Sequence, residues 1–249
     1  ANSQGAIDLG ILPQGNGLGA QLMLSAAAEG KLDALYVVAE DPLSSYPDRD
    51  KITKSLEKVP FLVVQDLFLS PTAQQADVVL PAASFAEKDG TFTNAERRIQ
   101  RVRQGIPSPG KARTDGAIFA ALAGKLGNSL SFTGPAAIFA EIGKEVPAYA
   151  EFDFNAIGPQ GVVWGGETLQ PVSRKVVNAG AGKTVEADFK LVTGSALYHS
   201  GTVSTRAKGP IAVLPEPYVE LSREDAKGLK IVDGDLVKVN GNGVELQLK

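Results

Sequence analysis

Three short apolar runs, separated by helical segments, constrain the fold of this chain more than any other feature. The runs comprise residues 34–38, 61–64 and 77–80, and each is rich in residues that favour β-strands. Apolar residues at helical spacing from Leu18 to Ala26 precede the first run, and a second helix is expected over residues 48–58. Strands that alternate with helices predict right-handed βαβ units and an α/β fold with a parallel sheet.

The predicted helices of the α/β fold end at about residue 150, and the elements expected after it are of a different kind. Helices are expected after the cap Thr114 and after Gly134, whereas the glycine-rich stretch that follows has no sustained period. Further along, residues 189–192, 219–221, 236–239 and 244–248 read as short strands, with one helix that Ser222 opens. The sequence therefore predicts an α/β domain over residues 1–150, a linker or crossover over 151–185, and a mostly β domain over 186–249.

The composition excludes several classes of chemistry. The chain has no cysteine and one histidine, which excludes disulfides, thiolate zinc sites, cysteine-ligated iron–sulfur clusters and a cysteine nucleophile. A net charge of −3 gives no sign of a nucleic-acid partner. Because we find neither a long apolar span nor a leader, we expect a soluble piece, and we expect both ends to be cuts in a longer polypeptide.

Glycines at positions 15, 17 and 19 precede the first helix and allow two interpretations. Together with Glu40, which follows the next strand, they resemble a dinucleotide fingerprint. The third glycine, however, stands one place early, and Pro13 interrupts any strand that would lead into the turn. A glycine turn into a helix is therefore the favoured interpretation.

Polar or turn-forming residues follow each of the three predicted strands. They are Glu40, Asp41 and Pro42 after the first, Gln65 and Asp66 after the second, and residues 81–84 after the third. In open parallel sheets, ligands bind beyond the carboxyl ends of the strands, so these residues predict a binding cleft. The alternative is ordinary loop chemistry, since Asp-Pro and serine turns also end strands.

A cationic stripe and a lone histidine are two further candidates. The stripe has six cations in seventeen positions, namely Arg97, Arg98, Arg101, Arg103, Lys111 and Arg113. One interpretation is a surface that binds phosphates or an acidic partner. The other is an edge hairpin exposed to solvent. His199 lies in a polar loop without the context of a hydrolase triad, so it is expected to bond an anionic ligand or its own backbone.

Several long motifs resemble the molybdopterin oxidoreductase superfamily. They comprise residues 61–70, 76–100, 197–206, 215–226 and 233–237. Within the superfamily they are similar to the large G subunit of NADH-quinone oxidoreductase, respiratory complex I. The resemblance implies an α/β cofactor-binding domain followed by a six-stranded double-psi β-barrel, whose last part would lie beyond Lys249.

The resemblance also implies a set of cofactor-binding residues. In catalytic relatives a bis-molybdopterin guanine dinucleotide lies between such domains, and the metal ligands lie upstream of this part. By position, the matching residues here are Glu40, Asp41, Pro42, Gln65, Asp66, Asp77, Gly90, Thr91, Thr193, His199, Gly201 and Thr202. Residues 39–42 read Ala-Glu-Asp-Pro where catalytic relatives usually read Gly-Glu/Ala-Asn-Pro, a departure in the nucleotide contact.

The function implied is that of a C-terminal portion of the complex I G subunit. We expect the chain to be a structural part of the peripheral electron-transfer arm, with other peripheral-arm subunits as its partners. We expect it to lie on the cytoplasmic side of the bacterial inner membrane without inserting into the membrane. We expect no catalytic or metal-binding residue in this portion and no bound cofactor, with the iron–sulfur clusters in the preceding part of the polypeptide. The alternative is the cofactor-binding portion of an active, formate-dehydrogenase-like molybdopterin guanine dinucleotide enzyme.

Overall fold

The computed structural model describes residues 2–165, 188–194, 201, 203–241 and 244–249. The chain divides into two compact units, residues 1–175 and residues 176–249, and each is described by itself. The domain boundaries that the sequence predicts at residues 150 and 185 stay predictions. No helix within the described ranges is long and apolar enough to cross a membrane.

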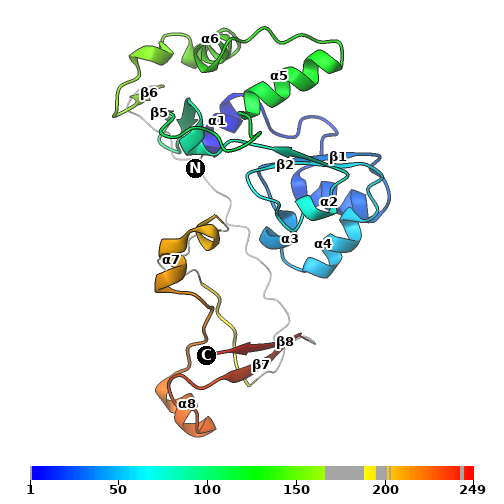
Figure 1. Cartoon of the computed structure of the whole chain (residues 1–249), viewed down its shortest axis with the longest axis vertical. Coiled ribbons are helices and arrows are strands. Elements are labelled where there is room, and N and C mark those ends of the chain that lie inside the picture. The colour runs from blue at the N-terminus through cyan, green and yellow to red at the C-terminus, as the bar shows by residue number, and fades with distance from the viewer. Residues whose placement is uncertain (1, 166–187, 195–200, 202, 242–243) are drawn as a thin grey trace. The chain divides into compact units, whose positions relative to one another are not determined.

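A three-stranded parallel sheet forms one part of the first unit (Figure 1). Its strands β1 (Leu35–Val38), β2 (Leu62–Asp66) and β3 (Val78–Pro81) lie in the order β1-β2-β3. Val37 pairs with Val64, and Val64 pairs with Val79, so one row of valines crosses the sheet. The three apolar runs of the sequence are these strands, and the predicted parallel α/β fold is confirmed.

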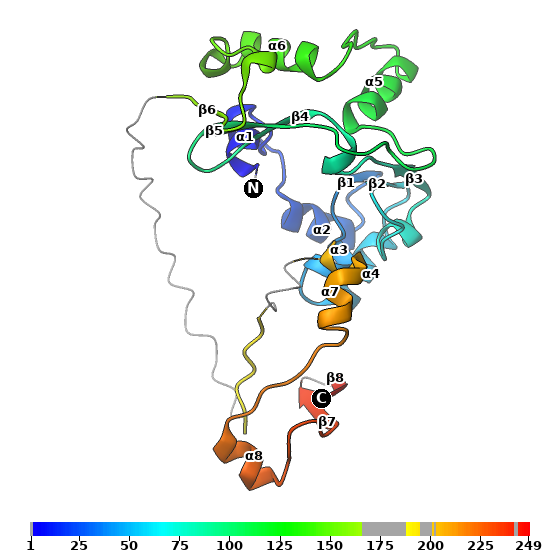
Figure 2. The same ribbon diagram turned by 60° about the vertical axis from the view of Figure 1, so that its left-hand side comes forward.

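One face of this sheet carries the first hydrophobic core. The helices α2 (Ala20–Ala28), α3 (Pro42–Ser45) and α4 (Arg49–Leu56) lie on that face (Figure 1, Figure 2), together with the turn η1 (Ala73–Gln75). Their apolar side chains pack against Val37, Leu62 and Val64; the buried members are Leu24, Leu43, Ile52, Leu56 and Ala73. The helices therefore hold the loops that follow β1 and β2 in fixed positions.

The first unit also contains a second sheet, which is antiparallel. Its strands are β4 (Gly90–Thr93), β5 (Arg98–Val102) and β6 (Val162–Val163), in that order. The other elements are α1 (Ser3–Asp8), η2 (Phe85–Glu87), α5 (Asp115–Lys125), α6 (Pro135–Glu145), η3 (Pro147–Tyr149) and η4 (Phe154–Ala156). Ile99 of β5 is fully buried in a core with Phe139, Tyr149, Phe154 and Ile157.

Within its described residues, the second unit contains fewer strands than the sequence predicts. Its elements are η5 (Ser204–Arg206), α7 (Lys208–Val213), α8 (Arg223–Leu229) and the antiparallel pair β7 (Val237–Gly241) and β8 (Val244–Leu248). Ser222 caps α8 as expected, since its side chain accepts a hydrogen bond from the Asp225 N–H at 3.0 Å.

Two of the strands predicted for the second unit are wrong. Residues 189–192 and 219–221 are irregular. Residues 219–221 have one backbone bond from the Val219 N–H to the Lys249 carbonyl, at 2.8 Å, instead of a ladder. A strand pattern without a paired neighbour does not make a strand. The described part of this unit forms a two-stranded sheet, so the six-stranded double-psi barrel is not confirmed.

Candidate functional site

The carboxyl ends of β1 and β2 bring four predicted site residues to one edge of the parallel sheet. Glu40 and Asp41 follow β1, and Gln65 and Asp66 end β2. Because both strands point the same way, their ends meet at the same edge. We call these four residues the carboxyl edge.

Asp41 joins the loop after β1 to the loop after β2. Its Oδ1 accepts hydrogen bonds from the Thr72 N–H at 3.1 Å and from the Thr72 hydroxyl, and its Oδ2 accepts from Ser44 Oγ at 2.6 Å. Thr72 is fully buried, and its Oγ1 accepts in turn from the Leu43 N–H at 3.2 Å. Pro42 is buried at the start of α3. Both oxygens of the Asp41 carboxylate are thus engaged within the protein.

The other two carboxylates of the carboxyl edge also accept hydrogen bonds from residues close to them in sequence. Asp66 accepts from the Leu67 N–H at 2.7 Å and from Ser70 Oγ at 2.9 Å. Glu40 is exposed and accepts from the Ser45 hydroxyl. These bonds order the loops that leave β1 and β2.

Gln65 is the buried centre of a polar network whose other members are partly exposed. Its Oε1 accepts from the Tyr36 hydroxyl, and its Nε2 donates to Asp115 Oδ1 at 2.6 Å. The other oxygen of Asp115 pairs with the Lys88 ammonium. Burial, and secondarily the negative charge of Asp115, raise the pKa of Tyr36. The network connects β1, β2 and the start of α5, while the Gln65 side chain is fully covered.

Sequence reasoning missed Asp115 and Lys88. Asp115 is the first residue of α5, directly after the predicted cap Thr114, whose side chain accepts from the Ala117 N–H at 3.4 Å. An acidic residue in the first turn of a helix has an ordinary explanation in the helix dipole. Its partnership with Gln65, fifty positions away in the sequence, has no local signal.

Asp77 does not join the carboxyl edge. It precedes β3, and its carboxylate accepts from the Leu62 N–H at 2.7 Å at the start of β2. The amino ends of parallel strands lie at the opposite edge from their carboxyl ends, so Asp77 is separated from Asp41 by the length of the strands.

The remaining predicted site residues belong to the second sheet or to the second unit. Gly90 and Thr91 belong to β4 of the second sheet, where they pair with Val102 and Arg101. Thr193 and Gly201 are exposed residues of the second unit. His199 and Thr202 lie outside the described residues.

The cationic stripe holds residues 154–164 against β5. The Arg97 guanidinium lies over the Trp164 ring, 4.9 Å from its centroid, and that of Arg101 lies 4.2 Å from the centroid of Phe154. Arg98 donates to the Gln160 carbonyl at 3.0 Å, and Arg103 donates to that of Ile157 at 3.2 Å. These four arginines serve the packing of the fold, a role that neither interpretation of the stripe anticipated.

The glycine cluster forms a turn into a helix. Gly15 has a φ of 57°, and Gly19 is the residue immediately before α2. The element before the cluster is the helix α1 instead of the strand that a dinucleotide fingerprint requires. The dinucleotide interpretation is therefore wrong.

The geometry defines an α/β protein in which the carboxylates of the carboxyl edge accept hydrogen bonds from the protein's own residues. Comparison with known proteins gives its family. The molybdopterin oxidoreductase family model matches residues 1–125. The chain belongs to the molybdopterin oxidoreductase family, as its motifs predict.

Two curated relatives are similar over most of the chain. The alpha subunit of the F420-dependent formate dehydrogenase of Methanocaldococcus jannaschii is 38% identical, over 86% of this chain and 36% of that protein. A G subunit of the NADH-quinone oxidoreductase of Rhizobium meliloti is 36% identical, over 96% of this chain and 28% of that protein. The chain thus spans about a third of the length of these relatives.

A solved structure supports the fold. Acetylene hydratase from Pelobacter acetylenicus matches with a TM-score of 0.62 at 16% identity, over 92% of this chain and 36% of that one.

The family implies a molybdopterin guanine dinucleotide, and the carboxyl edge can be tested for its fit. The polar side-chain groups of Asp41, Gln65 and Asp66 already bond to protein partners. Glu40, Asp41 and Asp66 also concentrate negative charge, which disfavours a diphosphate. In the arrangement described, these residues do not fit the nucleotide. The described ranges likewise contain no group of three acidic or histidine residues that could hold a metal ion.

Proposed function

We propose that this chain is the C-terminal portion of a G subunit of NADH-quinone oxidoreductase, with a structural role in the peripheral electron-transfer arm. One observation carries the proposal: the Asp41 carboxylate, which a nucleotide-binding edge would keep free, is bound to Thr72 and Ser44. The absence of cysteine fits this proposal and the catalytic alternative alike, because in both the iron–sulfur clusters and thiolate metal ligands belong to other parts of the polypeptide.

The proposed partners are the other peripheral-arm subunits of complex I. The Rhizobium meliloti relative is named as a subunit of a larger enzyme, which supports a role in an assembly. The proposed location is the cytoplasmic side of the bacterial inner membrane, where the chain is held by its partners.

The second candidate is the cofactor-binding portion of an active molybdopterin guanine dinucleotide enzyme of the formate dehydrogenase type. Two relatives named F420-dependent formate dehydrogenase subunits, at 38% and 37% identity, favour it. In that case the side chains of the carboxyl edge exchange their protein partners for the nucleotide when the cofactor enters.

The metal content of the complete gene product separates the two candidates. The protein is purified from its own host and analysed for molybdenum, tungsten and iron, with a molybdoenzyme from the same cells as the loading control. The proposal predicts iron without molybdenum or tungsten. About one molybdenum or tungsten per chain, with the control loaded equally, overturns it and supports the second candidate.

A further inference from the structure

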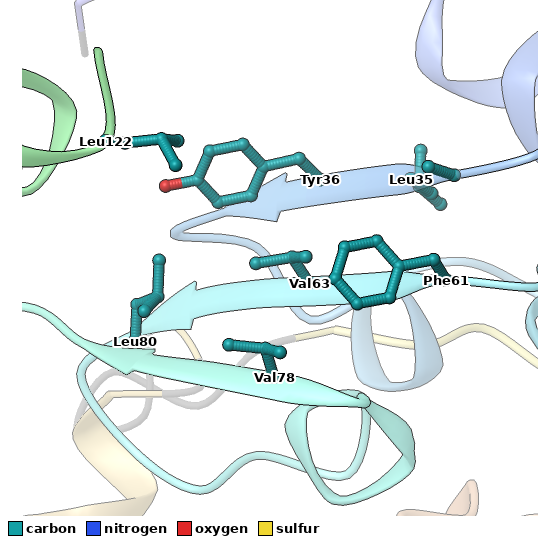
Figure 3. A pocket seen from close by; sticks show the side chains of 8 residues that line it. Leu35, Tyr36, Phe61, Val63, Val78, Leu80 and Leu122 are labelled. Atoms are coloured by element: carbon teal, nitrogen blue, oxygen red, sulfur yellow. The ribbon is translucent and has the colours of Figure 1, made fainter. Parts of the chain in front are cut away.

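The parallel sheet has a second face, which is apolar and open over part of its area. Tyr36, Val63 and Val78 form one row on this face, and Phe61 and Leu80 lie beside it. With Leu122 of α5 they line a hollow of about 440 Å³ (Figure 3). Phe61 is 47% exposed and Val78 is 37% exposed. Apolar residues at the centre of a parallel sheet are normally covered on both faces.

The topology explains why the chain leaves this face open. The strands follow one another in one direction across the sheet, β1-β2-β3. Right-handed crossovers between strands in such an order lie on the same face, and Leu43, Ile52 and Ala73 of the two crossovers pack there. Leu24 of α2 packs on that face as well. The chain from α2 to β3 therefore covers one face only.

Helix α5 reaches part of the open face. Phe119 makes an edge-to-face contact with Tyr36, with ring centroids 6.2 Å apart, and Leu122 lies near Tyr36 (Figure 3). The contacts of Asp115 with Gln65 and Lys88 fix the start of this helix at the carboxyl ends of the strands. Val78 and Phe61 stay exposed, so α5 does not complete the cover.

Strand β1 indicates where the remaining cover comes from. Within the described residues, β1 pairs with β2 alone, so its outer edge is open. In a doubly wound sheet, strands added beyond the first strand run their crossover helices over the opposite face. A strand added beside β1 would bring a helix onto the row of Tyr36, Val63 and Val78.

We propose that a helix of the longer polypeptide, outside residues 1–249, docks on this open face through an apolar stripe. The length of the relatives supports this occupant, because the chain spans only 36% and 28% of two of them. The hollow on this face is lined almost entirely by apolar atoms, which suits a helix with apolar residues on one side. The proposal is independent of whether the protein binds a cofactor.

Cysteines introduced on strand β3 test the proposal, because residues 1–249 contain no cysteine and mass spectrometry of one peptide separates the introduced thiol from any other. Val78→Cys lies on the open face, and Val79→Cys is its matched control. The two valines are adjacent and equally exposed, at 37%, and Val79 belongs to the row of Val37 and Val64 on the helix-covered face. Each variant is made in residues 1–249 and in the complete gene product, and maleimide labelling is followed by mass spectrometry of the peptide spanning residues 59–88.

We expect the thiol of Val78→Cys to react about tenfold or more slowly in the complete product than in residues 1–249, while that of Val79→Cys reacts at similar rates in both. Equal rates for Val78→Cys in the two proteins overturn the proposal, as does equal protection of both thiols. Residues 1–249 are also examined by sedimentation. If the Val78→Cys thiol is already protected there, the occupant is a second copy when the protein is dimeric, or residues 176–249 when it is monomeric, and the proposal is wrong.

Discussion

Asp41 and Thr72 are joined by two hydrogen bonds, although they are 31 positions apart and belong to loops that follow different strands. Thr72 is fully buried, so the Asp41 carboxylate extends into the protein as well as toward the edge of the sheet. A residue that a binding cleft would direct to a ligand thus fixes the position of two loops. Our account of the protein as a structural member of its family depends on this relationship.

Replacing Asp115 with alanine should destabilise the fold. The change removes the partner of Lys88 and leaves the buried Gln65 amide without an acceptor, which should lower the free energy of unfolding by about 2 kcal/mol. Urea unfolding measures the loss. The control is Glu141→Ala, which breaks the exposed ion pair to Lys144 and should cost less than about 1 kcal/mol. Equal losses in the two variants would show that the partly buried network around Gln65 contributes no more than a surface ion pair.

Tyr149 should make the stability of the chain depend on pH in the alkaline range. Burial raises its pKa from 10.0 to about 12, and its hydroxyl bonds to Asp8 at 2.8 Å and to Thr93 at 2.7 Å. Below pH 10 the phenol is neutral in the folded and the unfolded chain, so this contribution is fully present. It should be lost as the pH rises toward 12, because the folded state holds the proton more tightly.

The control for this pH dependence is Tyr149→Phe, which has no phenol to titrate. We expect the difference in unfolding free energy between the two proteins to shrink between pH 10 and pH 12. A difference that stays constant over this range would refute the assignment.

Arg101→Gln should loosen residues 154–164. The arginine lies over the Phe154 ring at 4.2 Å and donates to the Phe154 carbonyl at 3.5 Å, so its loss should cost about 1–2 kcal/mol. Trp164, the one tryptophan of the chain, reports the change by fluorescence. Lys111→Gln, at an exposed position of the same cationic stripe, is the matched control and should change little. Similar effects of both variants would contradict the packing role of Arg101 and support the interpretation of the cationic stripe as a solvated edge hairpin.

Gly161→Ala should disrupt the pairing of β5 with β6. Gly161 has a φ of 69°, and a Cβ atom there would lie 2.5 Å from the Ile99 carbonyl oxygen. We expect a loss of at least about 2 kcal/mol. At Gly158, by contrast, a Cβ atom would meet nothing within 4 Å, so Gly158→Ala should be close to neutral. Thermal unfolding of the two variants makes the comparison, and a stable Gly161→Ala protein would contradict the described backbone.

The strands of the parallel sheet were predictable because each is a continuous apolar run between polar loops. Glu40, Asp41, Gln65 and Asp66 were brought together as expected, since parallel strands end at one edge. Asp77 was placed with them only by resemblance, although its position before a strand puts it at the other edge.

The partners of these residues were not predictable. Thr72 lies 31 positions from Asp41, and Asp115 lies 50 positions from Gln65, and no local pattern marks either pair as partners. The arginines of the cationic stripe likewise bond to residues 154–164, more than fifty positions away. Spacing and composition report which residues are polar, whereas the choice of partner depends on how the elements pack.

A double-mutant cycle on Asp41 and Thr72 tests the central claim most directly. Asp41→Ala, Thr72→Val and the double variant of residues 1–249 are unfolded in urea and followed by circular dichroism. If the carboxylate serves the fold, the two changes couple by about 1 kcal/mol or more, and each single change is destabilising. A coupling near zero, with Asp41→Ala as stable as the original chain, would contradict the account, because the carboxylate would then be available to a ligand.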